Sequence, residues 1–309
     1  MLTILKKTTD GMRTFERLVD DCWVNVIDPT PEEIARLEEW QIPPEIITYP
    51  LDLDEIARTE KDNGFTLILL RVSFSQGNGA DIPYTTIPLG IILSEKFVVT
   101  ICKIDHPILQ EFCSKPVRDL TPAKRNRFVL QLFLTAAYRY LTHLQQINKT
   151  VDSLEDKLQL STRNRELLEI LKYQKCLVYF TTALKSNELM MEHLLRSQIF
   201  DQFEEDRDLL DDVITENRQA IEMTNIASNI LSSMMDGFAS IISNNLNTVM
   251  KFLAAITIIL TFPTMVASFF GMNVALPLQE HPSAFLFTIL VSVVFVGLAT
   301  YIFVKRDWF

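Results

Sequence analysis

Residues 252–270 read FLAAITIILTFPTMVASFF, and residues 283–304 read SAFLFTILVSVVFVGLATYIFV. Both stretches lack charged residues, and each is long enough to cross about 30 Å of hydrocarbon as a helix. The alternative is a buried helical hairpin of a soluble protein, but neither stretch has a polar face wide enough to contact water. The two stretches therefore predict two membrane-spanning helices, called here the first and second spans.

The charges that flank the spans predict how the chain crosses the membrane. The connection, residues 271–282, is short and contains no Lys or Arg, so the spans should form a hairpin. Lys251 precedes the first span, and Lys305 and Arg306 follow the second. By the positive-inside rule, we expect a multi-pass protein of the inner or plasma membrane with both chain ends in the cytoplasm.

The overall charge narrows the class of partner. The 309-residue chain has 39 acidic and 29 basic side chains, and therefore a net charge of −10. Because nucleic acids bind basic protein surfaces, this balance argues against a nucleic-acid partner and leaves room for cations. The four cysteines are scattered without a CxxC pair, which favours buried or free thiols over a metal or disulfide framework. The sequence has no phosphate-binding glycine loop or nucleophile motif, so an enzyme is the least favoured class.

The residues up to about position 120 predict an α+β domain. Thr30, followed by Pro31 and two acids, is typical of a helix start. Gly77, Gly79 and Gly90 predict turns between strands. Val, Ile, Leu and Phe gather in four stretches that predict strands, at residues 23–28, 65–74, 85–92 and 97–102. Because few helices separate these strands, we expect a partly antiparallel sheet.

The middle of the chain predicts long helices. Proline is absent from residues 123–262 and glycine from residues 91–236, while apolar residues recur at helical spacing. Residues 161–165 are the expected bend. The last helix should begin near Phe203 and continue into the first span as a stalk, roughly 100 Å long at 1.5 Å per residue.

Small polar residues follow one face of the first span. Thr257, Thr261, Thr264 and Ser268 recur at helical spacing, and the same face continues backward beyond the span to Asn247. Such a stripe is typical either of helix packing in a membrane or of a pore lining. Its continuation beyond the span favours a pore. Because two helices cannot enclose a channel, several copies would have to surround it.

Acidic residues gather at the start of the stalk. Residues 201–216 contain eight acids and one base, and five of the acids share a helical face: Asp201, Glu205, Asp208, Asp212 and Glu216. The complementary positions are apolar: Phe203, Leu210, Val213 and Ile214. A solvated face is the plain interpretation. The sharper one is a divalent-cation sensor between subunits, because bound Mg²⁺ relieves the repulsion between clustered carboxylates.

The tripeptide Gly271-Met272-Asn273 follows the first span directly. Together with the α+β domain, the stalk and the two C-terminal spans, it resembles the CorA family of divalent-cation transporters. The resemblance implies a homopentameric funnel with six regions: a cytoplasmic α/β domain (1–120), cytoplasmic long helices and stalk (121–246), a pore-lining helix (247–270), an extracytoplasmic loop (271–282), a second transmembrane helix (283–304) and a basic cytoplasmic tail (305–309).

The resemblance also implies roles for individual residues. Gly271, Met272 and Asn273 would form the selectivity ring at the outer mouth. The pore would be lined by Asn247, Met250, Leu253, Thr257, Thr261, Thr264 and Ser268, with Leu253 as a hydrophobic gate. Asp212, with Asp208 on the same face, would hold a regulatory Mg²⁺ between subunits. Its partner would be an acid of the neighbouring N-terminal domain, with Asp52, Asp54 and Glu55 as candidates.

The family pattern is not matched everywhere. Val274 stands where an aromatic residue is common, and Thr261 stands where a bulky apolar residue is common. The expected function is a gated Mg²⁺ channel that also admits Co²⁺ or Ni²⁺. Two alternatives stay open: a zinc transporter of the same family, and a membrane-anchored sensor or scaffold that conducts no ions.

Overall fold

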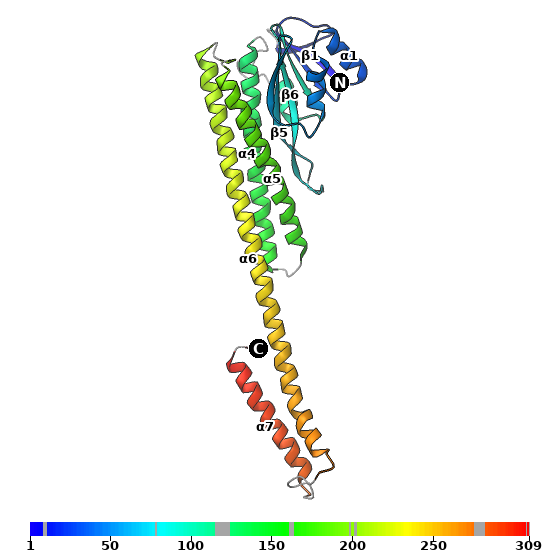
Figure 1. Ribbon diagram of the computed structural model, residues 1–309, viewed down its shortest axis with the longest axis vertical. Helices are drawn as coiled ribbons and strands as arrows, with labels where there is room; N and C mark the ends of the chain where they lie inside the picture. Colours follow the sequence, from blue (N-terminus) through cyan, green and yellow to red (C-terminus); the bar gives the residue numbers. More distant parts are fainter. Residues whose placement is uncertain are drawn as a thin grey trace. The chain divides into compact units, whose positions relative to one another are not determined.

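The computed structural model describes residues 1–8, 11–77, 79–114, 124–160, 164–197, 199–200, 203–274, 282–306 and 308. The chain forms two compact units, Met1–Ser232 and Ser233–Phe309. The first unit contains one sheet and the helices packed on it, and the second contains two apolar helices (Figure 1).

A seven-stranded sheet, in the order β2-β1-β3-β7-β6-β5-β4, organises the first unit. Its strands are β1 (Leu2–Thr8), β2 (Gly11–Phe15), β3 (Cys22–Ile27), β4 (Arg58–Asp62), β5 (Phe65–Ser75), β6 (Tyr84–Leu93) and β7 (Phe97–Cys102). β3 and β7 pair in parallel and the other neighbours pair antiparallel, which confirms the predicted partly antiparallel sheet. β1, β2 and β4 were not predicted from the sequence. β2 and β4 contain charged and exposed residues, and β1 has only the short buried pair Ile4 and Leu5, so none of them has the long apolar run of a central strand.

Both faces of the sheet are covered, which explains the nearly continuous apolar runs of its central strands. One face packs against α1 (Pro31–Glu39) and α2 (Pro44–Thr48), and the other packs against the long helices. Trp23 is fully buried on the side of the long helices. Its indole N–H donates to the Thr100 hydroxyl at 2.8 Å, and its ring lies 5.2 Å from that of Phe128.

Two local predictions have different outcomes. The helix start at Thr30 is confirmed, because its hydroxyl accepts from the Glu33 N–H while the Glu33 carboxylate accepts from the Thr30 N–H. The turn expected at Gly90 is wrong, since Gly90 lies inside β6, opposite Ile101 of β7. A Cβ atom at Gly90 would collide with the ring of Pro50, so glycine is needed there for close approach rather than for a turn.

Long helices follow the sheet, as predicted. After α3 (Pro107–Ser114), α4 (Arg125–Leu160) and α5 (Asn164–Arg196) form an antiparallel pair beside the sheet (Figure 1). The expected bend at residues 161–165 coincides with the end of α4 and the start of α5, although residues 161–163 themselves lie outside the described residues. α6 then runs without interruption from Glu204 to Phe270 and confirms the predicted stalk that continues into the first span.

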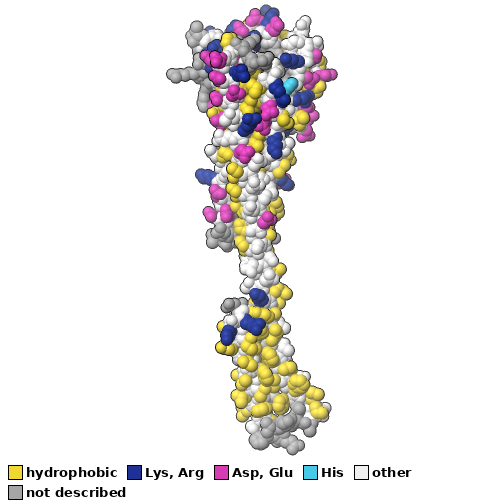
Figure 2. All heavy atoms as spheres, turned by 60° about the vertical axis from the view of Figure 1, so that its left-hand side comes forward, with side chains coloured by type: hydrophobic (Ala, Val, Ile, Leu, Met, Phe, Trp, Pro, Cys, Tyr) yellow, Lys and Arg dark blue, Asp and Glu magenta, His cyan; other side chains and the backbone are white. Residues whose placement is uncertain are grey.

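In the second unit, the C-terminal part of α6 packs on α7 (Ala284–Lys305). Phe262 stacks on Phe295, and Phe270 meets Phe287 edge-on. Both helices are long and apolar enough to span a membrane, yet only 11% of the most apolar window of α6 and 6% of that of α7 are buried. Figure 2 shows the hydrophobic side chains exposed on these helices. A core helix of a soluble protein would be mostly buried, so the two helices fit a lipid environment.

Candidate functional site

The face of α6 that carries the predicted pore residues lies opposite the face that contacts α7. Ala255 and Val266 are buried, and Phe262 is half-buried against Phe295 of α7. With 3.6 residues per turn, these three positions lie on the side of the helix away from the predicted stripe. All seven predicted pore residues are exposed: Asn247, Met250, Leu253, Thr257, Thr261, Thr264 and Ser268. Within one subunit the stripe is therefore open to a neighbour or to a lumen.

The threonine hydroxyls of this stripe donate their protons to the backbone of their own helix. Thr257 donates to the Leu253 carbonyl at 2.8 Å, Thr261 to the Thr257 carbonyl at 2.7 Å, and Thr264 to the Thr261 carbonyl at 2.8 Å. A hydroxyl has one proton and two lone pairs, so each of these groups is left to act as an acceptor. Acceptors suit the water shell of a cation, whose hydrogens point outward.

The part of α6 just before the first span is left exposed by the described residues of the subunit. Residues 239–254 are all exposed, although they include large apolar side chains such as Ile241, Leu246 and Val249. The stretch also carries no charge before Lys251. This stretch therefore exposes apolar side chains that are costly to leave in water. Packing against further copies of the same helix would cover them.

The predicted selectivity tripeptide stands at the end of α6. The Gly271 N–H donates to the Ala267 carbonyl at 3.0 Å, and the Met272 N–H donates to the Phe269 carbonyl at 3.2 Å. A Cβ atom on Gly271 would lie 3.3 Å from the Ala267 oxygen, a tight contact that favours glycine. Asn273 is exposed just beyond this turn. Its amide is therefore accessible at the mouth of the proposed pore.

The acidic face of the stalk agrees largely with its predicted pattern. Asp208 and Asp212 are exposed, whereas the complementary apolar residues Leu210, Val213 and Ile214 are buried against the sheet domain. Phe203, predicted to be on the apolar side, is instead 65% exposed because it precedes the first turn of α6. Asp201 lies outside the described residues.

The N-terminal candidates for the regulatory cation lie on the loop between η1 (Tyr49–Leu51) and β4. Asp52 and Asp54 are exposed, and the Asp54 N–H donates to an Asp52 carboxylate oxygen at 3.1 Å. Glu55 pairs with Arg58. Within the described part of one chain, no three His, Cys, Asp or Glu residues are grouped so that they could hold a metal ion. The structure does not bring Asp208 or Asp212 together with this loop inside a subunit, so a shared site would need two copies.

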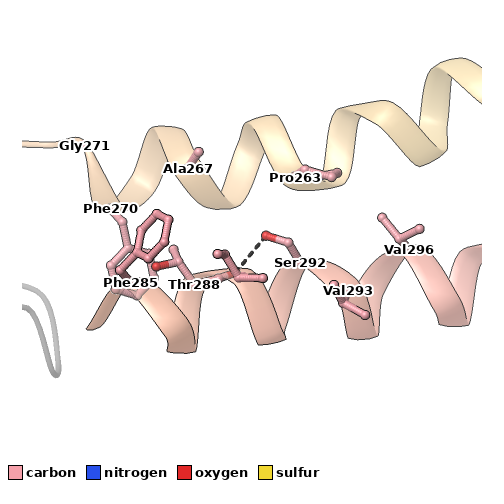
Figure 3. Close-up of a pocket in the computed structure, with 10 residues that line it drawn as sticks. Pro263, Ala267, Phe270, Gly271, Phe285, Thr288, Ser292, Val293 and Val296 are labelled. Carbon is pink, nitrogen blue, oxygen red and sulfur yellow. Dashed lines mark hydrogen bonds between the residues drawn. The ribbon is translucent and has the colours of Figure 1, made fainter. Parts of the chain in front are cut away.

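A pocket of about 670 Å³ lies between α6 and α7 near the Gly271 end (Figure 3). Pro263 and Ala267 line it from α6, and Thr288, Ser292 and others line it from α7. The Thr288 and Ser292 hydroxyls donate to carbonyls of their own helix at 2.7 and 2.8 Å. Most of the other lining side chains are apolar, and the pocket lies on the side of α6 away from the threonine stripe.

The chain is similar in sequence to CorA transport proteins. Residues 20–306 match the family model described as CorA-like Mg²⁺ transporter protein. The chain is 30% identical over 293 residues to the cobalt/magnesium transport protein CorA of Methanocaldococcus jannaschii, covering 93% of this chain and 90% of that one. It is 22% identical over 318 residues to a magnesium transport protein CorA of Helicobacter pylori, covering 99% and 96% respectively.

A solved structure extends the comparison to three dimensions. The complete CorA magnesium transporter from Methanocaldococcus jannaschii superimposes with a TM-score of 0.88 and 24% sequence identity. The match covers 100% of this chain and 99% of that one. The α+β domain, the long helix and the two apolar C-terminal helices therefore form the same fold in both chains.

Proposed function

Because the chain belongs to the CorA family of Mg²⁺ transporter proteins, we propose that it forms a gated pore that carries Mg²⁺ across the cell membrane into the cytoplasm. The observation that carries this proposal is the row of threonine hydroxyls on the open face of α6, whose protons are held by their own helix. Co²⁺ is a second expected cargo, since a relative is named as a cobalt/magnesium transport protein. Ni²⁺ is a further expected cargo, because it is a divalent transition-metal ion like Co²⁺.

The pore is built from several copies of α6. A single hairpin cannot enclose a lumen, and residues 239–254 leave apolar side chains uncovered in one subunit. Packing five copies around an axis, as the family resemblance implies, covers this surface. The same packing turns Thr257, Thr261 and Thr264 toward the axis and leaves α7 on the lipid side.

Permeation proceeds with the ion largely hydrated, because Mg²⁺ gives up its water reluctantly. A ring of Asn273 amides, supported by Gly271 and Met272, accepts hydrogen bonds from the hydration shell at the outer mouth. The threonine oxygens continue this role along the span. Leu253 and Met250, both more than half exposed on the same face, form an apolar constriction that closes by losing its water. The membrane potential drives entry, with about 2.3 kcal/mol per charge per 100 mV.

Regulation depends on a second Mg²⁺ between subunits. Asp208 and Asp212 of one copy would face the loop that carries Asp52, Asp54 and Glu55 of the next. Bound Mg²⁺ offsets the repulsion between these carboxylates and holds the closed arrangement, and loss of Mg²⁺ loosens it. In this topology residues 1–246 and 305–309 are cytoplasmic, and residues 271–282 are outside.

The decisive test is ion flux into liposomes that contain the purified protein. We expect Mg²⁺ entry from the unaltered protein, slower Zn²⁺ entry, and no Mg²⁺ entry from Asn273→Ala, which should still assemble by size-exclusion chromatography. Preferential Zn²⁺ entry would make the protein a zinc transporter, and the absence of any divalent flux would leave only a sensor or scaffold. Normal uptake by Asn273→Ala would remove the amide ring from the mechanism.

A further inference from the structure

Side chains from the helices, rather than a strand, close one edge of β5. β4 pairs with β5 only as far as Leu69. At Arg71, two residues further along, the amide of Asn187 on α5 takes the place of the missing strand. Its oxygen accepts from the Arg71 N–H at 2.9 Å, and its nitrogen donates to the Arg71 carbonyl at 2.8 Å. The Tyr140 hydroxyl of α4 donates to the same carbonyl at 3.1 Å, so the backbone of Arg71 is bonded to both helices.

The side chain of Arg71 is bonded to the loop that carries Asp52, Asp54 and Glu55. Its Nη1 donates to the carbonyls of Leu53 at 2.8 Å and Glu55 at 2.7 Å. Its Nη2 donates to the Thr86 carbonyl at 2.6 Å and to the Thr86 hydroxyl at 2.8 Å. All of these acceptors are uncharged oxygens. The guanidinium therefore holds the backbone on both sides of Asp54 and leaves that carboxylate exposed to solvent.

The segment of α5 around Asn187 is also bonded to α6. The buried amide of Asn217 donates to the Leu184 carbonyl at 3.1 Å. Arg218 pairs with Glu188 at 2.7 Å and with Glu192 at 3.0 Å. Leu184 and Glu188 lie within one turn of Asn187. A continuous series of hydrogen bonds thus joins the acidic loop, Arg71, α5 and the part of α6 that follows Asp212.

We propose that Arg71 is the positioning residue through which cation binding at the loop 52–55 acts on α5 and α6. This inference rests on the proposed regulatory site. The arginine fork makes several hydrogen bonds in a fixed plane, so a displacement of the loop moves the β5 edge and the Asn187 amide with it. Without the fork the loop still carries its carboxylates and binds the ion. The helices, however, no longer follow the loop.

The test uses the full chain in liposomes and two substitutions of the same chemical kind. Arg71→Met keeps the aliphatic bulk and removes the fork. We expect the Mg²⁺ concentration that halves the flux to rise at least about fivefold, the lower end of usual allosteric couplings, with unchanged flux at low Mg²⁺. Arg36→Met is the matched control, since the Arg36 guanidinium bonds the Glu16 carbonyl and lies over the Trp40 ring, and these contacts do not involve residues 52–55. Arg36→Met should leave the Mg²⁺ concentration that halves the flux unchanged.

Hydrogen exchange separates coupling from binding. In the unaltered protein, Mg²⁺ should slow exchange both at residues 52–56 and at residues 184–188 of α5. In Arg71→Met, only the loop should respond. If Arg71→Met does not assemble, Arg71→Lys serves instead, because it keeps the charge but reaches fewer acceptors, and it should give a smaller shift in the same direction.

Each outcome has one meaning. An unaltered protein that conducts but is not inhibited by Mg²⁺ overturns the proposed regulation, and this inference with it. Normal inhibition of the unaltered protein, together with an unshifted midpoint and a responding α5 in the Arg71 variant, overturns the role of Arg71 alone.

Discussion

Phe262 of α6 and Phe295 of α7 stack with their ring centroids 5.6 Å apart and their planes 7° from parallel. This contact fixes the rotation of α6 about its own axis within the hairpin. Because Phe262 faces α7, Thr257 and Thr261 face away from it and stay exposed. The stacking of two aromatic rings therefore decides which side of α6 is available to a lumen.

The first prediction concerns the threonine oxygens. Thr261→Val keeps the shape of the side chain but removes the acceptor, so each subunit loses a hydrogen bond to the hydrated ion, worth about 1 kcal/mol. We expect Mg²⁺ flux in liposomes to fall at least several-fold. Thr288→Val on α7 is the matched control, because its hydroxyl is bonded to its own helix in the same way but lines the pocket beside α6. Equal effects of the two changes would refute a lining role for Thr261.

The second prediction concerns the apolar constriction. Leu253→Asn should keep the narrow region wet, so that flux persists at Mg²⁺ concentrations that close the unaltered protein. Leu253→Met keeps the apolar character and should close normally. Residual flux at high Mg²⁺ is the quantity to measure. If the asparagine variant closes as completely as the methionine variant, the gate lies elsewhere.

The third prediction separates two neighbouring acids of the stalk. Asp212 and Asp211 are both exposed on α6. Asp212 lies at the centre of the face that Glu205, Asp208 and Glu216 share, whereas Asp211 lies about 100° around the helix from Asp212. Asp212→Ala should raise the half-inhibiting Mg²⁺ concentration about fivefold or more, because the bound ion loses a ligand. Asp211→Ala removes the same charge and should shift the midpoint little. Similar shifts for both would mean that total charge, not a defined site, controls closure.

The sequence predicted the elements whose patterns are long and regular. The two spans and the central strands have long apolar runs, and the stalk has apolar residues at helical spacing, and such patterns predict helices and strands directly. The edge strands β2 and β4 were not predicted because their charged and exposed side chains carry no such pattern. β1 was not predicted because its buried residues are only Ile4 and Leu5, too short an apolar run to recognise. Gly90 was mistaken for a turn residue, since its need for close approach to Pro50 depends on a contact between segments that are distant in the sequence.

The candidate site was predicted from helical spacing and from the tripeptide, because both are local features. Arg71 and Asn187 could not be found in this way. Their role depends on β4 ending at Leu69 and on α5 passing that edge, which are properties of the tertiary structure. The pairing of Asp212 with a loop acid depends further on a second subunit, so neither one sequence nor one chain establishes it.

The fourth prediction concerns stability. Gly90→Ala places a methyl group against Pro50 in a packed region, and overpacking of this kind costs roughly 1–3 kcal/mol. We expect a lower melting temperature in detergent with unchanged assembly before heating. Gly237→Ala is the control, because a Cβ atom there meets no atom within 4 Å and alanine favours the helix. It should melt at the same temperature or higher. A Gly90 variant as stable as the unaltered protein would mean that Pro50 moves aside freely.

The last prediction follows from two buried histidines beside β5. The Ile108 N–H donates to Nδ1 of His106, and Nε2 of His106 bonds the Ser73 carbonyl at 2.9 Å, while His143 bonds the Ser73 hydroxyl at 3.0 Å. Burial, and then the charge of Arg139, lowers the pKa of both imidazoles from 6.5 to about 4. The unfolded chain therefore binds more protons between these values, and stability is lost as the pH falls from about 6.5 to about 4.

We expect the melting temperature of the unaltered protein to drop across this window more steeply than that of His143→Gln, which retains a hydrogen-bonding group but does not titrate. The difference between the two curves isolates the imidazole from the carboxylates, which titrate in both proteins. Carboxylates with lowered pKa values, such as Glu33, add to the slope equally in each. Parallel curves would show that His143 stays neutral in the unfolded chain as well, or that it protonates in the folded state without cost. Either result would contradict a histidine held neutral by its burial beside β5.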